Sequence, residues 1–162
     1  MKKIKYTILT CVLFSGVIMS TKDAMANEVI EIKNLSYELV KAQLDPKVNI
    51  KVAPLAGDKT MSMYATVLKP GSKVTSHMHN QDVELYYILN GSGEIYTGHL
   101  QENTANVLWD PVKQVKQGDA FAINPGKVHQ LKNTSQSEDL TLLFVCPHSH
   151  LKDDRVITND FK

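Results

Sequence analysis

Three side chains that can ligate a metal lie close together in the sequence, at His77, His79 and Glu84. The two histidines are two positions apart, and alternate side chains of a β-strand point to the same face, so a strand here would aim both imidazoles the same way. Residues 80–82 are typical of a turn, and a strand over 83–89 would return beside the first with Glu84 near its start. Two neutral imidazoles and a carboxylate suit a borderline divalent metal such as zinc, iron, nickel, copper or manganese. The pattern therefore predicts a metal site.

A downstream stretch supplies one more histidine. Residues 118–133 read GDAFAINPGKVHQLKN, in which His129 follows a turn at Pro125 and Gly126 and begins a predicted strand. A third imidazole would strengthen the metal site if the fold brought this strand beside the first one. The sequence alone leaves that convergence open.

The first cluster resembles the first motif of the cupin superfamily. That motif is a glycine, five residues, H-x-H, three or four residues, a glutamate, six residues and a glycine. Every one of these spacings is met, by Gly71, His77, His79, Glu84 and Gly91.

The second cluster resembles the second cupin motif, which is a glycine, five residues, P-x-G, two residues, a histidine, three residues and an asparagine. Gly118, Gly126, His129 and Asn133 stand in register with it. Asn124 occupies the place of the proline, which follows one position later. This departure alters the turn and leaves the histidine in register.

The resemblance covers residues 61–146. It implies a small antiparallel β-barrel of jelly-roll type that binds one divalent transition metal (Fe, Mn, Zn, Ni or Cu), with these ligands: His77, His79, Glu84 and His129. It also suggests a homodimer, because small cupins commonly pair. Tyr86 and Ile88 share the strand parity of Glu84 and should line the cavity. Tyr86 is the candidate catalytic acid or base, and a packed barrel tyrosine is the alternative.

The elements needed to position these residues are mostly strands. Short runs of alternating apolar and polar residues, separated by Gly, Pro and Asn turns, are predicted as strands over 48–52, 61–69, 74–79, 83–89, 94–97, 112–115, 120–123, 128–132 and 140–146. A short strand over 29–32 and then a helix from Leu35, capped by Asn34, are predicted before them. Many short strands with little helix predict an all-β antiparallel barrel or sandwich.

The N-terminus has the three parts of a bacterial secretory signal peptide. Residues 1–5 are positively charged, residues 6–19 form an apolar run too short to span a bilayer comfortably, and Ala24 to Ala26 form an A-x-A cleavage pattern. We expect cleavage after Ala26 and a periplasmic or secreted mature protein. A membrane anchor or a buried helix is the alternative reading of this segment.

Composition narrows the partners of the expected mature chain. Residues 1–26 hold four lysines and one aspartate, so their removal leaves 14 basic and 16 acidic residues and shifts the formal charge from +1 to −2. No basic face is implied, which argues against nucleic acid and, after cleavage, against membrane as partners. Cys146 is the only cysteine of the mature chain, so no internal disulfide can form.

The predicted organisation is a signal peptide (1–26), an N-terminal extension with strands that pack on the barrel (27–60), the cupin barrel (61–146) and a C-terminal tail (147–162). The tail begins with Cys146, His148 and His150 in the sequence C-P-H-S-H, which could hold a second metal. The alternative is a tail packed across the barrel with its polar residues in solvent and the cysteine buried and inert. Arg155 is expected to pair in solvent with Asp153 or Asp154, or else to bind a substrate carboxylate.

The leading hypothesis is an exported metal-dependent enzyme that acts on a small organic molecule by dioxygenase-like or lyase-like chemistry. Three imidazoles and one carboxylate leave coordination positions open for water, oxygen or a bidentate substrate. A non-catalytic protein that binds or senses a small ligand is the first alternative, and a sugar isomerase or epimerase the second. The fold does not choose among them, because cupins carry many chemistries.

Overall fold

A computed structural model describes residues 30–102, 104 and 106–161 of the chain. The predicted signal peptide and its cleavage position lie outside the described residues. The chain separates into two units, residues 1–31 and Ile32–Lys162, and the second is the one described below. No helix in its described part is long and apolar enough to cross a membrane.

Helix α1 (Leu35–Lys41) precedes the strands, as predicted. The side chain of Asn34 accepts a hydrogen bond from the backbone N–H of Tyr37 and caps the first turn, which leaves one fewer N–H unsatisfied. The predicted strand over 29–32 is wrong in its described part, where the backbone is irregular. Ile32 is 90% exposed there, so no sheet packs against it.

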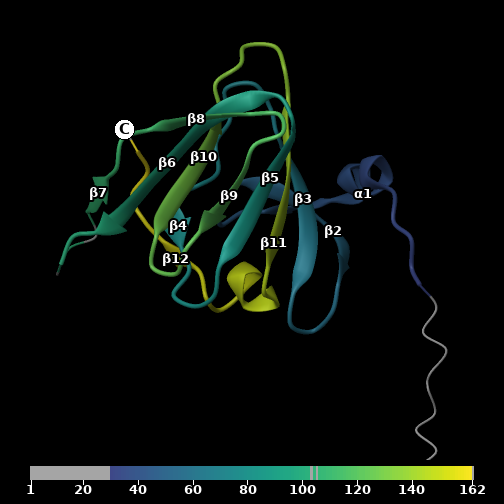
Figure 1. Cartoon of the computed structure of the whole chain (residues 1–162), viewed down its shortest axis with the longest axis horizontal. Coiled ribbons are helices and arrows are strands. Elements are labelled where there is room, and N and C mark those ends of the chain that lie inside the picture. The colour runs from purple at the N-terminus through teal and green to yellow at the C-terminus, as the bar shows by residue number, and fades with distance from the viewer. Residues whose placement is uncertain (1–29, 103, 105, 162) are drawn as a thin grey trace, which may run out of the picture. The chain divides into compact units, whose positions relative to one another are not determined.

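Two antiparallel sheets form the body of the unit (Figure 1). In spatial order the first sheet contains β1 (Gln43–Asp45), β2 (Ile50–Gly57), β3 (Ser62–Leu68), β11 (Leu140–Cys146), β5 (Glu84–Asn90) and β9 (Ala120–Ile123). The second contains β12 (Val156–Ile157), β4 (His77–Met78), β10 (Val128–Asn133), β6 (Ser92–Leu100) and β7 (Val107–Trp109), with β8 (Lys113–Lys116) also paired to β6. The all-β antiparallel prediction is confirmed.

The core lies inside the barrel, and strand alternation puts it there. Along β11 the even-numbered positions, from Leu140 to Cys146, are buried while the odd ones are only partly covered. Leu131 and Ile88 bring the same kind of inward face from β10 and β5. A second, smaller cluster lies where Leu35 and Leu39 of α1 pack near Ala65 of β3.

One prediction about pairing is wrong. Residues 74–79 and 83–89 were expected to form a hairpin, but β4 pairs with β10 and β12 whereas β5 pairs with β11 and β9. The segment 80–83 therefore crosses between the two sheets. Asp82 turns the chain there with a positive φ of 59°. The strand also shortens to His77–Met78, because Val74 and Thr75 bond to different neighbours, at Leu131 and Val48.

The motif glycines occupy positions that other residues would strain. Gly91 has a φ of +83°, and a Cβ atom there would lie 2.4 Å from the carbonyl oxygen of Asp139. Gly126 has a φ of +75°, and its N–H donates to the carbonyl oxygen of His79 at 2.7 Å. The first glycine lets β5 turn tightly into β6, and the second ties the turn before β10 to the histidine strand.

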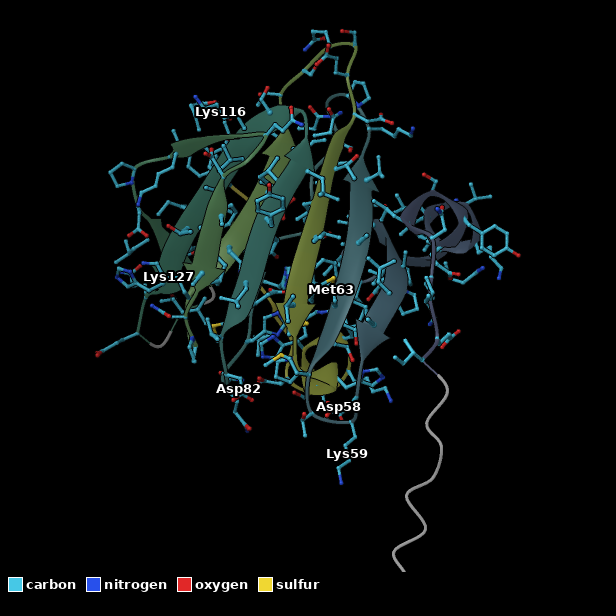
Figure 2. The ribbon with its side chains drawn as sticks, turned by 45° about the vertical axis from the view of Figure 1, so that its right-hand side comes forward. Asp58, Lys59, Met63, Asp82, Lys116 and Lys127 are labelled. Carbon is cyan, nitrogen blue, oxygen red and sulfur yellow. The ribbon has the colours of Figure 1, made fainter. Side chains whose placement is uncertain are left out.

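The outer face of the first sheet is apolar beyond the area near α1. Met63, Val145, Leu85 and Ala122 are successive cross-strand neighbours on β3, β11, β5 and β9. Figure 2 shows Met63 on this sheet, beside β11. Met63 and Leu85 are exposed, as is Tyr87 on β5. Strands alternate faces, so these are the positions that do not reach the core.

Candidate metal centre

The four predicted ligands converge, although they come from three strands of two sheets and the segment next to them. His77 on β4 is the direct cross-strand partner of His129 on β10, and their ring centroids lie 4.3 Å apart. His79 follows β4 on the same face, and Glu84 opens β5 in the opposite sheet. All four side chains are buried. One nitrogen or oxygen atom from each lies within 4.8 Å of the others.

Backbone carbonyls fix the orientation of each imidazole. Nδ1 of His77 bonds to the carbonyl oxygen of Thr75 at 2.8 Å, and Nδ1 of His129 bonds to that of Lys127 at 3.2 Å. Nδ1 of His79 bonds to the carbonyl oxygen of Asp154. A carbonyl can only accept, so these partners assign the proton to Nδ1 in each ring. In the neutral imidazole, Nε2 is then left as a free electron-pair donor, which is the form that binds a metal.

The arrangement around Glu84 suits a cation. Nε2 of His129 lies 3.2 Å from Oε2 of Glu84, and Nε2 of His79 lies 3.6 Å from the same oxygen. Nε2 of His129 is buried and has no hydrogen-bond partner among the described residues. Electron-pair donors that face one another in a buried site repel unless a positive charge lies between them. The three imidazoles and the carboxylate therefore fit a metal ion, by the chemistry of the donors and by this orphaned nitrogen.

The pKa of His77 agrees with this view. Burial lowers that pKa well below its ordinary value, with a further contribution from His129. A neutral imidazole is the protonation state that a metal ligand needs.

Tyr86 adjoins the cluster, as its strand parity predicted. Its hydroxyl donates a hydrogen bond to Oε2 of Glu84 at 3.3 Å. Burial raises the pKa of Tyr86 well above its ordinary value, and the charge of Glu84 raises it further. The side chain is therefore a protonated phenol that can hold the carboxylate in place, and its role in catalysis stays a prediction.

The C-terminal segment completes the site, which corrects the expectation that its polar residues lie in solvent. The carboxylate of Asp154 accepts hydrogen bonds from the backbone N–H groups of Asn80 and Gln81, at 2.8 and 2.9 Å. Nε2 of His150, in the 3-10 helix η1 (His148–Leu151), bonds to the carbonyl oxygen of Gln81 at 2.7 Å. Both side chains are buried. The C-terminal segment thus holds in place residues 80–83, which connect His79 to Glu84.

Two residues of the C-P-H-S-H sequence, Cys146 and His150, stay together in the structure, and His148 lies apart from them. His148 is exposed, and its Nδ1 lies in a hydrogen bond of 2.8 Å with the hydroxyl of Tyr64. Cys146 is fully buried, as expected, and burial raises the pKa of its thiol. Donor atoms of Cys146, His150 and Glu84 lie within 4.8 Å of one another. The C-P-H-S-H spacing pointed to His150 as a candidate site residue. Nothing in the sequence indicated that the backbone carbonyl of Asp154 would bond to His79.

Arg155 does not pair in solvent with Asp153 or Asp154. Its Nη1 atom lies 2.6 Å from Oδ2 of Asp45 on β1, and only 3% of its side chain is exposed. Its Nε atom donates to the carbonyl oxygen of His150 at 3.1 Å. A partner 110 residues earlier in the chain could not be read from the local sequence.

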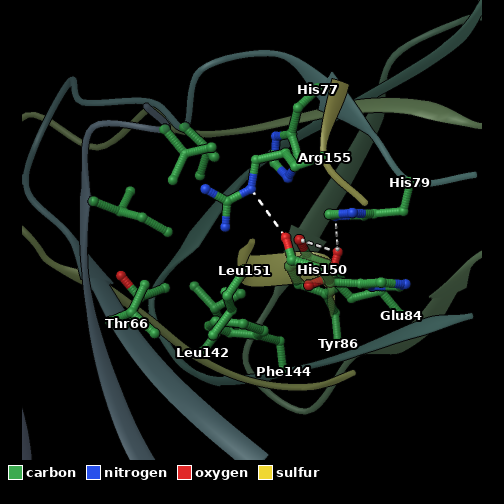
Figure 3. A pocket seen from close by; sticks show the side chains of 14 residues that line it. Thr66, His77, His79, Glu84, Tyr86, Leu142, Phe144, His150, Leu151 and Arg155 are labelled. Atoms are coloured by element: carbon green, nitrogen blue, oxygen red, sulfur yellow. Dashed lines mark hydrogen bonds and ion pairs between the residues drawn. The ribbon is translucent and has the colours of Figure 1, made fainter. Parts of the chain in front are cut away.

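A cavity connects these groups (Figure 3). Its volume is about 20 Å³. The walls are made by three metal-cluster residues, by Tyr86, His150, Arg155 and Thr66, and by apolar side chains: Val48, Ile50, Val52, Val74, Leu142, Phe144 and Leu151. The site is therefore a small, mostly apolar chamber with a few polar groups, which is typical of small-molecule sites.

Comparisons with known proteins agree on the fold. The family model of the cupin domain matches residues 64–146. An oxalate-binding protein of Thermotoga maritima is 28% identical over 122 residues, which are 72% of this chain and 91% of that protein.

Solved structures show the same fold at lower identity. An uncharacterized conserved protein with a double-stranded β-helix domain from Klebsiella pneumoniae is 16% identical, with a TM-score of 0.59 over 81% of this chain and 99% of that one. A predicted oxalate decarboxylase from Thermotoga maritima is 23% identical, with a TM-score of 0.55 over 72% of this chain and 96% of that one.

Proposed function

The chain belongs to the cupin family, and from that premise we propose that it is an exported, metal-dependent enzyme acting on a small organic molecule. The observation that carries the proposal is the convergence of three buried Nε2 atoms and one carboxylate on a single point, with each Nδ1 bonded to a backbone carbonyl. Export is supported by the lysines, the apolar run and the A-x-A pattern of residues 1–26.

His77, His79, Glu84 and His129 would hold one divalent transition metal, drawn from iron, manganese, zinc, nickel and copper. When bound, such a metal supplies Lewis acidity and open coordination positions for a substrate. The residues around it have separate tasks. The Thr75, Lys127 and Asp154 carbonyls keep the imidazoles oriented, and Tyr86 holds Glu84.

The chemistry proposed for this chamber is dioxygenase-like or lyase-like. The apolar walls exclude bulk water from the reacting atoms, which strengthens every electrostatic interaction inside. Tyr86 is a proton donor in contact with the ligand set, because its hydroxyl donates a hydrogen bond to Glu84. The sugar isomerase or epimerase alternative is less well supported, because the walls offer few polar groups to a polyhydroxylated substrate.

The experiment loads the purified mature chain with iron or manganese and follows oxygen uptake and product formation over a panel of small organic acids, alcohols and sugars. Turnover that is lost in Glu84→Ala and His129→Ala together with the metal supports the enzyme. Metal binding without turnover of any compound in the panel would overturn it and leave the binding alternative.

A non-catalytic small-ligand protein is the alternative function that a specific observation favours. The relative from Thermotoga maritima is called an oxalate-binding protein, and it spans most of this chain. In that case the metal presents a ligand without transforming it. A ligand that co-purifies with the metal-loaded protein, and is recovered unchanged after prolonged incubation, distinguishes this function from catalysis.

We also propose that the chain is a homodimer that pairs through the outer face of its first sheet. Met63, Leu85 and Tyr87 are exposed on that face and leave it apolar. A stable interface covers about 800 Å² on each partner. Light scattering should give twice the chain mass, and Leu85→Glu should give the mass of one chain.

A further inference from the structure

We infer that Arg155 and Thr66 select a small carboxylate as the ligand of the metal chamber. This inference rests on the metal centre of the proposed function and adds the chemical class of the ligand. It holds for an enzyme and for a binding protein, because recognition precedes any reaction.

Arg155 is the only arginine of the chain, and the fold places it in the wall of the chamber (Figure 3). The contacts with Asp45 and with the carbonyl oxygen of His150 use two of its five N–H donors. They also hold the guanidinium plane in one orientation. A guanidinium that is already fixed loses little entropy when it binds a carboxylate, and its planar N–H groups match the two carboxylate oxygens.

Thr66 supplies a second, independent sign of a ligand. Its side chain is on β3 in the wall of the chamber and is 1% exposed. Its hydroxyl has no hydrogen-bond partner within the described ranges of the chain. A buried hydroxyl without a partner is unfavourable, and an oxygen of a bound ligand would satisfy it.

The chamber lining restricts the carboxylate further. The chamber is small, so it favours the shortest carboxylates. The apolar walls from Val48, Val52 and Leu142 offer no partner to a hydroxyl-rich chain. A short mono- or dicarboxylate meets the small size and the two polar positions together.

The test titrates oxalate, and oxamide as its neutral counterpart, into the manganese-loaded protein by calorimetry. Manganese affinity and content are measured before and after each titration, so that removal of the metal by oxalate is recognised. We expect the wild type to bind oxalate at least tenfold more tightly than oxamide. We expect Arg155→Gln to lose that preference and Thr66→Val to weaken oxalate binding three- to tenfold, with manganese affinity unchanged within threefold.

Asp45→Asn is the matched control, because it removes the partner of Arg155 and keeps the guanidinium. The Asp45→Asn variant should retain the preference for oxalate. If the role of Arg155 were purely structural, Asp45→Asn would lose that preference, as Arg155→Gln does. Thermal unfolding identifies any variant that fails to fold, and Thr66→Val, which preserves side-chain shape, then decides the case. Equal binding of oxalate and oxamide by the metal-loaded wild type overturns the inference alone. A wild type that binds no metal overturns the proposed function and this inference with it.

Discussion

The imidazole of His150 stacks on that of His79, with ring centroids 3.9 Å apart and planes 3° from parallel. The stack is held from both sides, because His150 bonds to the carbonyl of Gln81 and His79 bonds to that of Asp154. The C-terminal segment thus determines how one predicted metal ligand faces its neighbours.

The first prediction concerns this stack. His150→Ala should lower metal affinity 10- to 100-fold, which is the usual cost of removing a group that orients a ligand. His150→Phe keeps an aromatic ring on His79 and should recover most of that loss. Competition with a metal chelator measures both variants. Unchanged affinity in His150→Ala would show that the stack does not position the ligand.

The second prediction concerns the ligands. Glu84→Gln preserves the shape of the side chain and removes its charge, and His129→Ala removes the orphaned nitrogen. Each should lower metal affinity by more than 100-fold, because the loss of a ligand atom costs more than the loss of a group that only orients a ligand. His99→Ala is the control, because His99 is exposed on β6 and should leave metal content at one ion per chain. Elemental analysis after dialysis gives the ratios.

The third prediction separates the two readings of Tyr86. Tyr86→Phe removes the hydroxyl that donates to Glu84 and should lower metal affinity by at most about tenfold, the net value of one ordinary hydrogen bond. If the tyrosine is the proton donor of a reaction, kcat should fall 10²- to 10⁴-fold in the metal-loaded variant. An unchanged kcat would limit Tyr86 to a positioning role.

The fourth prediction concerns stability. Asn133 is fully buried, and its amide nitrogen donates to the carbonyl oxygens of Leu68 and Glu138. Asn133→Ala should lower the free energy of unfolding by about 2 to 4 kcal/mol, because it removes the donor of one buried and one partly buried hydrogen bond. Urea denaturation measures the change. Asn124→Ala, at an exposed turn, should stay within about 0.5 kcal/mol of the wild type.

The fifth prediction concerns pH. Lys127 and the hydroxyl of Thr97 hold the pKa of Asp110 below its usual value. A lowered folded-state pKa stabilises the protein above the ordinary carboxyl pKa, and the gain disappears as the pH falls through the folded value. Asp110→Asn should therefore cost roughly 0.5 kcal/mol at pH 7, as expected for a pair open to solvent, and nothing once the pH is well below 3.8. A difference that persists in strong acid would exclude the ion pair as its cause.

The cluster could be predicted because its chemistry and its strand parity are local. His77 and His79 share a face by alternation, and the spacing up to Gly91 and Asn133 matched a known pair of motifs. The helix from Leu35 followed from its cap and its period. The metal cluster and this helix depend on residues that are close in the sequence, and for that reason the sequence could predict them.

The hairpin over 74–89 was predicted wrongly for the opposite reason. Which strand pairs with β4 depends on β10 and β12, which come later in the chain. The same holds for Asp154 and Arg155, whose partners lie 74 and 110 residues away in sequence. Packing of the C-terminal segment on the barrel fixes them, and no local pattern of residues encodes that packing.

The carbonyl of Asp154 that orients His79 also sets an order of events during biogenesis. A chain that is synthesised from its N-terminus has the segments with His77, His79 and His129 before it has residue 154. Until that residue arrives, His79 lacks its backbone acceptor and its stacked neighbour. The candidate metal centre is therefore complete only once residue 154 has been made, later than all four of its candidate ligands.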